Sequence, residues 1–341
     1  MEKICVLGAG SFGTSLAILL TNKNEYNVVL WTRDKKQYDE MLNTRKNENY
    51  LKDIYLPEKL SISIDLESSL QDSNVILLAV PSQAVRSVLR TIKPYVKDDQ
   101  IIVNVAKGLE KETGLRISEI VKQELPNNKY VVLSGPSHAE EIAKEVPTAI
   151  VSSSQDIKVA EYIQNIFSTS KLRVYTNPDV IGVELGGALK NIIAFGAGIA
   201  DGLGCGDNTK AALMTRGIRE IARLGIKMGA KLSTFSGLSG IGDLIVTCTS
   251  MHSRNRRAGI LIGQGKSLDE TLHEIKMVVE GITATQVAYE LSKKYNVDMP
   301  ITKEIYKVLY EKKDVKECIE NLMLRDKAQE LEEVVLEKLS L

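Results

Sequence analysis

A glycine-rich loop near the start of the chain constrains the fold more than any other feature. Gly8, Gly10 and Gly13 directly follow the apolar run Lys3–Leu7 and lead into the apolar pattern Ser15–Leu20. In this setting the first glycine permits a tight turn, the second lets a pyrophosphate approach the backbone, and the third lets a helix pack closely on a strand. The phosphates then lie at the helix N-terminus. The pattern predicts a dinucleotide-binding unit, and an ordinary glycine-rich turn is the simpler alternative.

Short apolar runs alternate with helical patterns through the first half of the chain. Runs rich in Val, Ile and Leu without polar alternation are typical of a parallel sheet that helices cover on both faces. The runs that we predict to be strands are Lys3–Leu7, Asn27–Trp31, Val75–Val80, Ile101–Val105, Tyr130–Leu133, Thr148–Val151 and Lys171–Val174.

The pattern changes near residue 180, after which helical spacing dominates. Apolar residues recur at helical spacing from Met214 to Met228, and Ile282–Tyr295 and Ile301–Lys312 are also typical of helices. We therefore predict an α/β fold in which residues 1–180 form an N-terminal Rossmann-type, doubly wound, mainly parallel sheet. Residues 181–341 are predicted to form an all-α domain, with the functional site in the cleft between the two.

Length, charge and cysteine usage exclude several classes of protein. A chain of 341 residues exceeds the usual size of one core, and 44 basic residues balance 44 acidic ones, which disfavours a nucleic-acid partner. The four cysteines contain no Cys-x-x-Cys pair, so we expect reduced thiols and no metal site. The longest apolar run, Ile192–Ala200, is too short to span a bilayer. We expect a cytoplasmic protein without stable membrane insertion.

One lysine lies inside the apolar, glycine-rich segment Val183–Ala200. If the segment is helical, Lys190 has only small and apolar neighbours one turn away and no local carboxylate. Burial disfavours the charged form of a lysine and lowers its pKa toward neutrality, as a proton donor near pH 7 requires. We interpret Lys190 as a catalytic candidate. The alternative is a lysine at the wet edge of a core helix.

The residues after the second predicted strand bear on the choice of dinucleotide. An NAD-selective site would place an acid there to bind the ribose, whereas this chain has Arg33 followed by Asp34. A guanidinium can pair with a 2′-phosphate, which favours NADP(H). Asp34 leaves NAD(H) open, and a surface ion pair of Arg33 is the structural alternative.

Four further clusters lie where a sheet or its partner domain would face a ligand: Ala106–Leu109, Leu133–Ala139, Gly237–Leu244 and Met251–Arg256. Together they supply Lys107, Arg254, Ser137, Ser253 and Asn255, a set suited to a small phosphorylated anion. Taken one at a time, these residues could equally be solvated loop positions.

Asp243 could hold one of the lysines in place, or it could merely cap a helix.

At these residues the chain closely resembles the bacterial NAD(P)-dependent sn-glycerol-3-phosphate dehydrogenases over essentially its whole length. The matching segments are Gly8–Gly13, Val105–Gly108, Leu133–Glu141, Val183–Gly217, Gly237–Arg257 and Val278–Thr283. The resemblance implies that the cofactor contacts are Gly8, Gly10, Ser11, Phe12, Gly13, Arg33, Lys107, Ala139, Arg254, Val278 and Glu280. It implies that the substrate contacts are Lys107, Gly135, Ser137, Lys190, Asp243, Ser253, Arg254 and Asn255.

Catalytic roles are implied for Lys190 as the proton donor and acceptor, with Lys107 and Asp243 beside it. Asn191 and Thr247 are similar to substrate-side positions of the wider family.

The activity that the resemblance implies is reversible, NAD(P)H-dependent reduction of dihydroxyacetone phosphate to sn-glycerol 3-phosphate, which supplies glycerol phosphate for phospholipid synthesis. No metal is needed, and a homodimer is left open. One alternative is another Rossmann-type keto-acid or hydroxyacid reductase, which would need a site for a carboxylate. Another is a non-catalytic dinucleotide-sensing protein, in which the lysines and arginines would be surface residues.

Overall fold

An eight-stranded sheet forms the first part of the molecule, in a computed structural model that describes residues 1–327. Its strand order is β10-β9-β8-β7-β6-β1-β2-β5. The strands are β1 (Glu2–Leu7), β2 (Tyr26–Trp31), β5 (Ser61–Ser63), β6 (Val75–Leu78), β7 (Ile101–Asn104), β8 (Lys129–Ser134), β9 (Thr148–Ser153) and β10 (Leu172–Asn177). All seven predicted strands are present, with ends that differ by up to three residues.

Most neighbouring strands in the sheet are parallel, as predicted. The exception is the pairing of β8 with β9, which is antiparallel, so β9 and β10 run opposite to the rest. A separate two-stranded ribbon, β3 (Lys46–Asn47) and β4 (Leu51–Tyr55), lies outside the sheet. Neither this ribbon nor β5 was predicted from the sequence.

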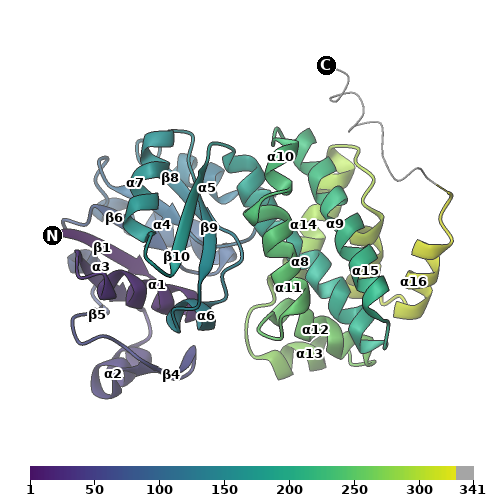
Figure 1. The fold of residues 1–341 in the computed structure, drawn as a ribbon, viewed down its shortest axis with the longest axis horizontal. Helices are drawn as coiled ribbons and strands as arrows, with labels where there is room; N and C mark the ends of the chain where they lie inside the picture. The colour runs from purple at the N-terminus through teal and green to yellow at the C-terminus, as the bar shows by residue number, and fades with distance from the viewer. Residues whose placement is uncertain (328–341) are drawn as a thin grey trace.

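Helices cover both faces of the sheet, because alternate residues of each strand point to opposite sides. In β1, Ile4 and Val6 belong to one apolar cluster, whereas Cys5 and Leu7 belong to another. The helices of this part are α1 (Ser11–Asn22), α2 (Lys35–Thr44), α3 (Leu66–Leu70), α4 (Val85–Ile92), α5 (Ile117–Glu124), α6 (Ala139–Ala143) and α7 (Ile157–Phe167). Figure 1 shows them around the sheet at one end of the molecule.

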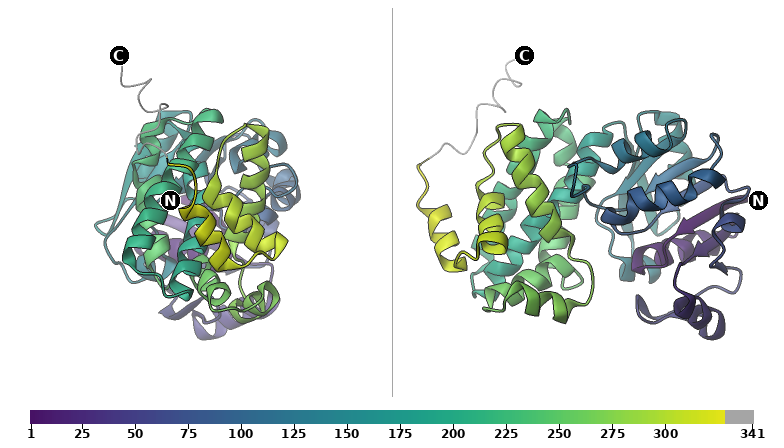
Figure 2. Two further views of the ribbon diagram at one scale, coloured as in Figure 1. Left: turned by 90° about the vertical axis from the view of Figure 1, so that its right-hand side faces the viewer. Right: turned by 180° about the vertical axis from the view of Figure 1, so that it is seen from behind.

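The second part is helical and packs around one long helix, α8 (Val180–Gly202). Its other helices are α9 (Asp207–Lys227), α10 (Leu232–Phe235), α11 (Asp243–Thr249), α12 (Arg254–Gly263), α13 (Leu268–Ile275), α14 (Glu280–Lys294), α15 (Pro300–Glu311) and α16 (Val315–Met323). A Cβ atom on Gly198 would lie 2.1 Å from the carbonyl oxygen of Arg256, so α8 and α12 touch through their backbones. Figure 2 shows the two parts from two further sides, with α16 farthest from the sheet.

Helix α8 is long and apolar enough to cross a membrane by length and composition alone, but 94% of its most apolar window is buried inside the protein. A buried core helix can be equally long and apolar, so the length and composition of α8 are weak support for a membrane span.

The predicted domain boundary lies between residues 180 and 181, close to the start of α8, and it stays a prediction. The last residues of the predicted second domain, 328–341, lie outside the described residues.

Candidate active site

The parallel strands bring the predicted cofactor residues to one edge of the sheet. Leu7, Trp31, Leu78 and Asn104 are in register at the carboxyl ends of β1, β2, β6 and β7. The loops that follow these strands therefore emerge side by side, which is where open α/β sheets bind ligands.

The glycine loop between β1 and α1 has the geometry that its sequence predicts. Gly8 has φ +112°, and a Cβ atom there would lie 2.7 Å from the carbonyl oxygen of Ala79. A Cβ on Gly13 would lie 2.1 Å from the carbonyl oxygen of Gly8, whereas one on Gly10 would meet no atom of the described residues within 4 Å. Backbone atoms therefore fill the space beside Gly8 and Gly13, whereas the space beside Gly10 is open. This open space fits a dinucleotide pyrophosphate at the start of α1.

The side-chain amides of Gln37 and Asn47, which we did not predict, hold the glycine loop in place. The carbonyl oxygen of Ala9 accepts hydrogen bonds from Gln37 Nε2 at 2.6 Å and Asn47 Nδ2 at 2.9 Å. Nearby, Ser11 Oγ donates to the carbonyl oxygen of Tyr50 at 2.6 Å. Gln37 and Asn47 are both buried in the structure, and the sequence around them carries no signal of this.

Arg33 and Asp34 have different surroundings. The side chain of Arg33 is exposed directly after β2. Asp34 is the N-cap of α2, and its Oδ1 accepts from the backbone N–H groups of Lys36 at 2.8 Å and Gln37 at 3.2 Å. This capping accounts for the acid at position 34 without a role in ribose binding.

Lys190 is buried in α8 and binds a carboxylate that is distant in sequence. Only 5% of its surface is exposed, and its Nζ donates to Asp243 Oδ1 and, at 2.6 Å, to Thr247 Oγ1. Thr247 Oγ1 in turn donates a hydrogen bond to the carbonyl oxygen of Asp243 at 2.6 Å, one turn earlier in α11. Burial, reinforced by the positive charge of Lys107 and opposed by Asp243, lowers the pKa of Lys190 to about 8.

Lys107 reaches the same carboxylate from the sheet side. Its Nζ donates to Asp243 Oδ2 at 2.8 Å, to the carbonyl oxygen of Gly135 at 2.8 Å and to Ser137 Oγ at 3.2 Å. The two lysines therefore share Asp243, one on each carboxylate oxygen. Asp243 is 1% exposed, so its charge is committed to these two ammonium groups.

A chain of amides runs beside the lysines. Asn191 Nδ2 donates to the carbonyl oxygen of Lys107 at 3.3 Å, and Asn255 Nδ2 donates to Asn191 Oδ1 at 2.9 Å. Asn255 Oδ1 in turn accepts from the backbone N–H of Gly281 at 2.8 Å. These bonds connect the start of α12 to the lysine cluster.

The start of α12 presents Ser253 and Arg254. Ser253 is the N-cap of α12 and accepts from the backbone N–H of Arg256 at 3.2 Å. Arg254 is half-buried, its Nη1 lies 3.4 Å from the carbonyl oxygen of Val278, and burial lowers the pKa of its guanidinium. The N-terminus of α12 and this guanidinium offer positive charge to an anion.

Glu280, at the start of α14, joins the helical part to the sheet. Its carboxylate accepts from Ser82 Oγ at 2.7 Å and from the backbone N–H of Ser82 at 3.3 Å, just after β6. Burial raises the pKa of Glu280, whereas the hydrogen bonds from Ser82 and the charge of Arg254 act to lower it. Ser82 had not been singled out from the sequence, because nothing nearby marks a partner 198 residues away.

Most of the predicted residues fall into two groups. The others, at or next to the starts of α6, α12 and α14, are Ala139, Ser253, Arg254, Val278 and Glu280. Lys107, Gly135, Ser137, Lys190, Asp243, Thr247, Asn191 and Asn255 form one hydrogen-bonded network. The other group lies at the glycine loop and the end of β2, and no hydrogen bond within residues 1–327 joins it to the network: Gly8, Gly10, Ser11, Phe12, Gly13 and Arg33.

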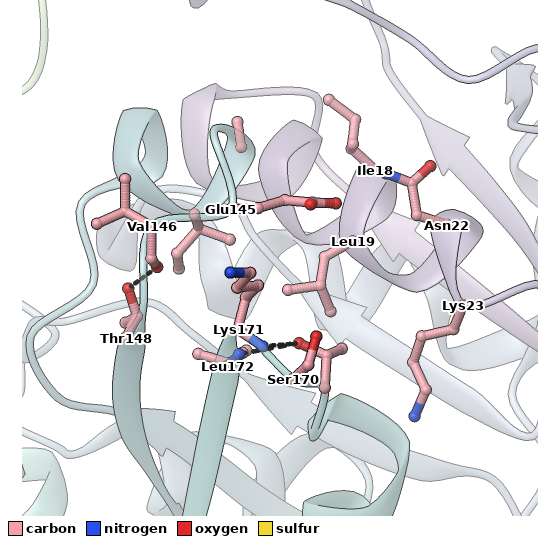
Figure 3. A pocket seen from close by; sticks show the side chains of 13 residues that line it. Ile18, Leu19, Asn22, Lys23, Glu145, Val146, Thr148, Ser170, Lys171 and Leu172 are labelled. Atoms are coloured by element: carbon pink, nitrogen blue, oxygen red, sulfur yellow. Dashed lines mark hydrogen bonds between the residues drawn. The ribbon is translucent and has the colours of Figure 1, made fainter.

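A separate pocket of about 220 Å³ lies between α1, α6 and the starts of β9 and β10. Figure 3 shows its lining, which includes Ile18, Leu19, Glu145, Val146 and Lys171. None of the predicted site residues lines it. Among residues 1–327, no three His, Cys, Asp or Glu side chains are grouped so that they could hold a metal ion.

A dinucleotide-type sheet whose ligand edge faces a buried lysine in a helical bundle defines the class of NAD(P)-dependent dehydrogenases. Two family models match the chain: the N-terminal part of the NAD-dependent glycerol-3-phosphate dehydrogenases over residues 3–160 and their C-terminal part over residues 179–320. The chain belongs to the NAD-dependent glycerol-3-phosphate dehydrogenase family.

Individual relatives agree over nearly the full length. The glycerol-3-phosphate dehydrogenase [NAD(P)+] of Clostridium perfringens is 55% identical over 330 residues, 97% of this chain and 99% of that protein. That of Fusobacterium nucleatum is 53% identical over 334 residues, 97% of this chain and 99% of that protein. The crystal structure of the Coxiella burnetii glycerol-3-phosphate dehydrogenase superposes with a TM-score of 0.92 at 38% identity, covering 95% of this chain and 99% of that one.

These findings confirm the predicted fold class, the family and the use of NAD(P)H. The chain is an NAD(P)-dependent oxidoreductase, and its substrate is a small phosphorylated compound. The roles of the individual site residues stay predictions.

Proposed function

We propose that Lys190 is the proton donor in the reduction of dihydroxyacetone phosphate to sn-glycerol 3-phosphate, the NAD(P)H-dependent reaction that this enzyme catalyses. NAD(P)H, when bound, supplies a hydride to the ketone carbon. The ketone oxygen then becomes an alkoxide, which needs a proton and electrostatic stabilisation. Lys190 can supply both, because its pKa of about 8 leaves it protonated at neutral pH yet ready to release the proton. In the reverse direction the neutral amine accepts the proton of the alcohol.

Lys107 stabilises the same oxygen by charge in this proposal. It is held by Asp243, Gly135 and Ser137, so its ammonium is oriented before substrate arrives. Preorganised charge in a site from which water is partly excluded stabilises a developing oxyanion more than mobile charge does. Asp243 is a positioning residue that keeps both ammonium groups beside one another.

The substrate phosphate binds at the start of α12 in this proposal. Ser253 and Arg254 offer a hydroxyl and a guanidinium there, and the helix N-terminus adds positive partial charge. Asn255 uses its oxygen and one N–H within the protein, which leaves one N–H for the substrate. Binding energy from this remote phosphate orients the carbonyl beside Lys190.

The proposed cofactor residues are the glycine loop with Ser11 and Phe12, together with Arg33, Lys107, Ala139, Arg254, Val278 and Glu280. Arg33 is exposed and Asp34 is occupied as a helix cap, which supports a preference for NADPH over NADH.

Further proposals concern the setting of the enzyme. Its product supplies glycerol phosphate for phospholipid synthesis. The burial of α8 supports the absence of membrane insertion, and the cytoplasmic location stays a prediction. The homodimer stays a prediction, as does the absence of a nucleic-acid partner.

The single observation that carries the proposed chemistry is the pair of ammonium groups, Lys190 and Lys107, on one buried carboxylate. Initial rates of NADPH oxidation with dihydroxyacetone phosphate, pyruvate and ketopantoate test the substrate class. We expect turnover with dihydroxyacetone phosphate alone. Preferred turnover of a keto acid would identify a keto-acid reductase, and NADPH binding without turnover of any substrate would identify a dinucleotide sensor.

A further inference from the structure

Two of the three histidines in the chain meet where the sheet part faces the helical part. The ring centroids of His138 and His252 lie 5.6 Å apart with the rings tilted by 52°. His138 follows Ser137 in the loop after β8, whereas His252 precedes Ser253 before α12. Each histidine is thus a sequence neighbour of a residue of the proposed substrate site. His138 belongs to the sheet part and His252 to the helical part.

The Nε2 atom of His138 is buried, and it has no hydrogen-bond partner within the part of the chain that the structure describes. A buried polar atom without a partner costs free energy, so such an atom in a native protein calls for an explanation. The neighbouring Ser137 contacts the ammonium group of Lys107, which places His138 beside the lysine network. A bound substrate is the partner that this position favours.

The charges around His138 indicate which part of the substrate it binds. Burial, followed by the positive charges of Lys190 and Lys107, lowers its pKa, and Glu140 and Glu141 oppose this with smaller effects. The imidazole is therefore neutral at pH 7. A neutral imidazole matches a neutral hydroxyl, and the cations of the site remain available for the carbonyl oxygen and the phosphate.

We propose that His138 Nε2 hydrogen-bonds the C1 hydroxyl of dihydroxyacetone phosphate and so makes the enzyme specific for a hydroxymethyl ketone. The inference rests on the proposed function, which gives the substrate a reacting carbonyl, a phosphate and this one further hydroxyl. Nε2 can donate to or accept from that hydroxyl, depending on the imidazole tautomer. A site that pairs a buried polar atom with a substrate hydroxyl discriminates against the analogue that lacks it.

The test compares dihydroxyacetone phosphate with hydroxyacetone phosphate, in which a methyl group replaces the hydroxymethyl group. The wild-type enzyme, His138→Phe and His138→Gln are each assayed for kcat/KM with both substrates and for NADPH affinity. We expect His138→Phe to lower kcat/KM for dihydroxyacetone phosphate on the order of tenfold and to change that for hydroxyacetone phosphate by less than about twofold. His138→Gln, which keeps a polar end group, should recover part of the discrimination.

The third histidine provides the matched control. His273 lies exposed on α13, so His273→Phe should leave both substrates at wild-type values. Equal losses with the two substrates in His138→Phe, or no loss with either, would overturn the assignment. His138→Gln gives the same comparison if the phenylalanine variant does not fold. A wild-type enzyme that reduces neither substrate would instead overturn the proposed function.

Discussion

At the scale of single residues, Lys190 shows how burial prepares a side chain for chemistry. Its local neighbours on α8 are glycines and apolar residues, and within the described part of the chain its polar partners, Asp243 and Thr247, come from α11. Desolvation lowers the pKa of the ammonium, and the Asp243 carboxylate limits this effect so that the group remains charged at neutral pH.

The pKa of Lys190 predicts opposite pH dependences for the two directions of the reaction. Reduction needs the protonated amine, so kcat/KM should fall as the pH rises through about 8. Oxidation of glycerol 3-phosphate needs the neutral amine and should become faster over the same range. Rates are measured from pH 7 to 10, where the substrate phosphate remains a dianion because its second pKa is about 6. A midpoint near the ordinary lysine value in both directions would show that Lys190 is not the titrating group.

Arg33 should determine the choice of nicotinamide cofactor. We expect Arg33→Ala to weaken NADPH binding by about 1.5–3 kcal/mol, or roughly tenfold to a hundredfold, because a charge-assisted bond to the 2′-phosphate is lost. NADH, which lacks that phosphate, should change much less. Lys158→Ala removes an exposed charge on α7 and serves as the control. An unchanged NADPH-to-NADH ratio in Arg33→Ala would rule out the pairing.

At the scale of elements, helix α15 depends on a carboxylate from another helix. Glu220 of α9 is 1% exposed and accepts from the backbone N–H groups of Ile301 at 2.7 Å and Thr302 at 3.2 Å. Glu220→Ala leaves these helix N-terminal donors buried without an acceptor. We expect the free energy of unfolding to fall by about 1–3 kcal/mol in urea titrations.

Glu311, exposed at the other end of α15, provides the matched control for this stability prediction. Glu311→Ala should change the free energy of unfolding by no more than about 0.5 kcal/mol. An equally small change in Glu220→Ala would contradict the capping role.

The start of α12, which carries Ser253 and Arg254, is bound to the end of α8. Asp201 accepts from Arg256 Nε at 2.7 Å and pairs with Lys210 at 2.8 Å, and Arg256 Nη1 also donates to the carbonyl oxygen of Thr249 at 2.7 Å. We expect Asp201→Asn to raise KM for dihydroxyacetone phosphate on the order of tenfold with a smaller effect on kcat, because a charge-assisted bond that positions the phosphate site is weakened.

Asp207, a fully exposed aspartate that also lies near Lys210, provides the matched control for Asp201→Asn. Asp207 lies 3.7 Å from Lys210, and its side chain is solvent-accessible. Asp207→Asn should leave both kinetic constants unchanged. If the two variants behave alike, the anchoring of the start of α12 by Asp201 has no kinetic role.

The elements that could be predicted from the sequence are those that bury apolar surface. β6 and β7 are short runs of Val, Ile and Leu, and such runs predict buried strands directly. By contrast, β5 has only the three residues Ser61–Ser63. In the ribbon, β3 is two polar residues and the apolar residues of β4 neither alternate nor form a continuous run, so no apolar period marks these strands. The reversal of β9 is equally invisible, because a strand buried on both faces has the same composition in either direction.

At the scale of the whole molecule, the catalytic cluster is assembled from both parts of the chain. Lys107 follows β7 of the sheet, whereas Lys190 and Asp243 belong to the helical part, and 136 residues separate Lys107 from its carboxylate. Residue types and the family resemblance identified the members of this cluster. The sequence indicated that Asp243 could hold one of the lysines. That it binds both Lys107 and Lys190 could not be predicted, because this depends on how the sheet edge meets α8 and α11. The same reason explains why the Ser82–Glu280 contact was missed.

The proposed role of Lys190 as the proton donor is tested most directly by replacing it with a side chain of similar length that has no ionisable group. Lys190→Met leaves Asp243 paired with Lys107, so the carboxylate keeps a counterion and the fold should persist. The dinucleotide binds at the sheet edge in this account, so NADPH affinity should stay close to wild type.

The decisive measurement is kcat for reduction of dihydroxyacetone phosphate by Lys190→Met, alongside the Kd for NADPH from fluorescence titration. We expect a loss in kcat of about 100-fold or more, the lower end of what a positioned acid contributes, with little change in Kd. A kcat near the wild-type value, with NADPH still bound, would contradict the proposed role of Lys190.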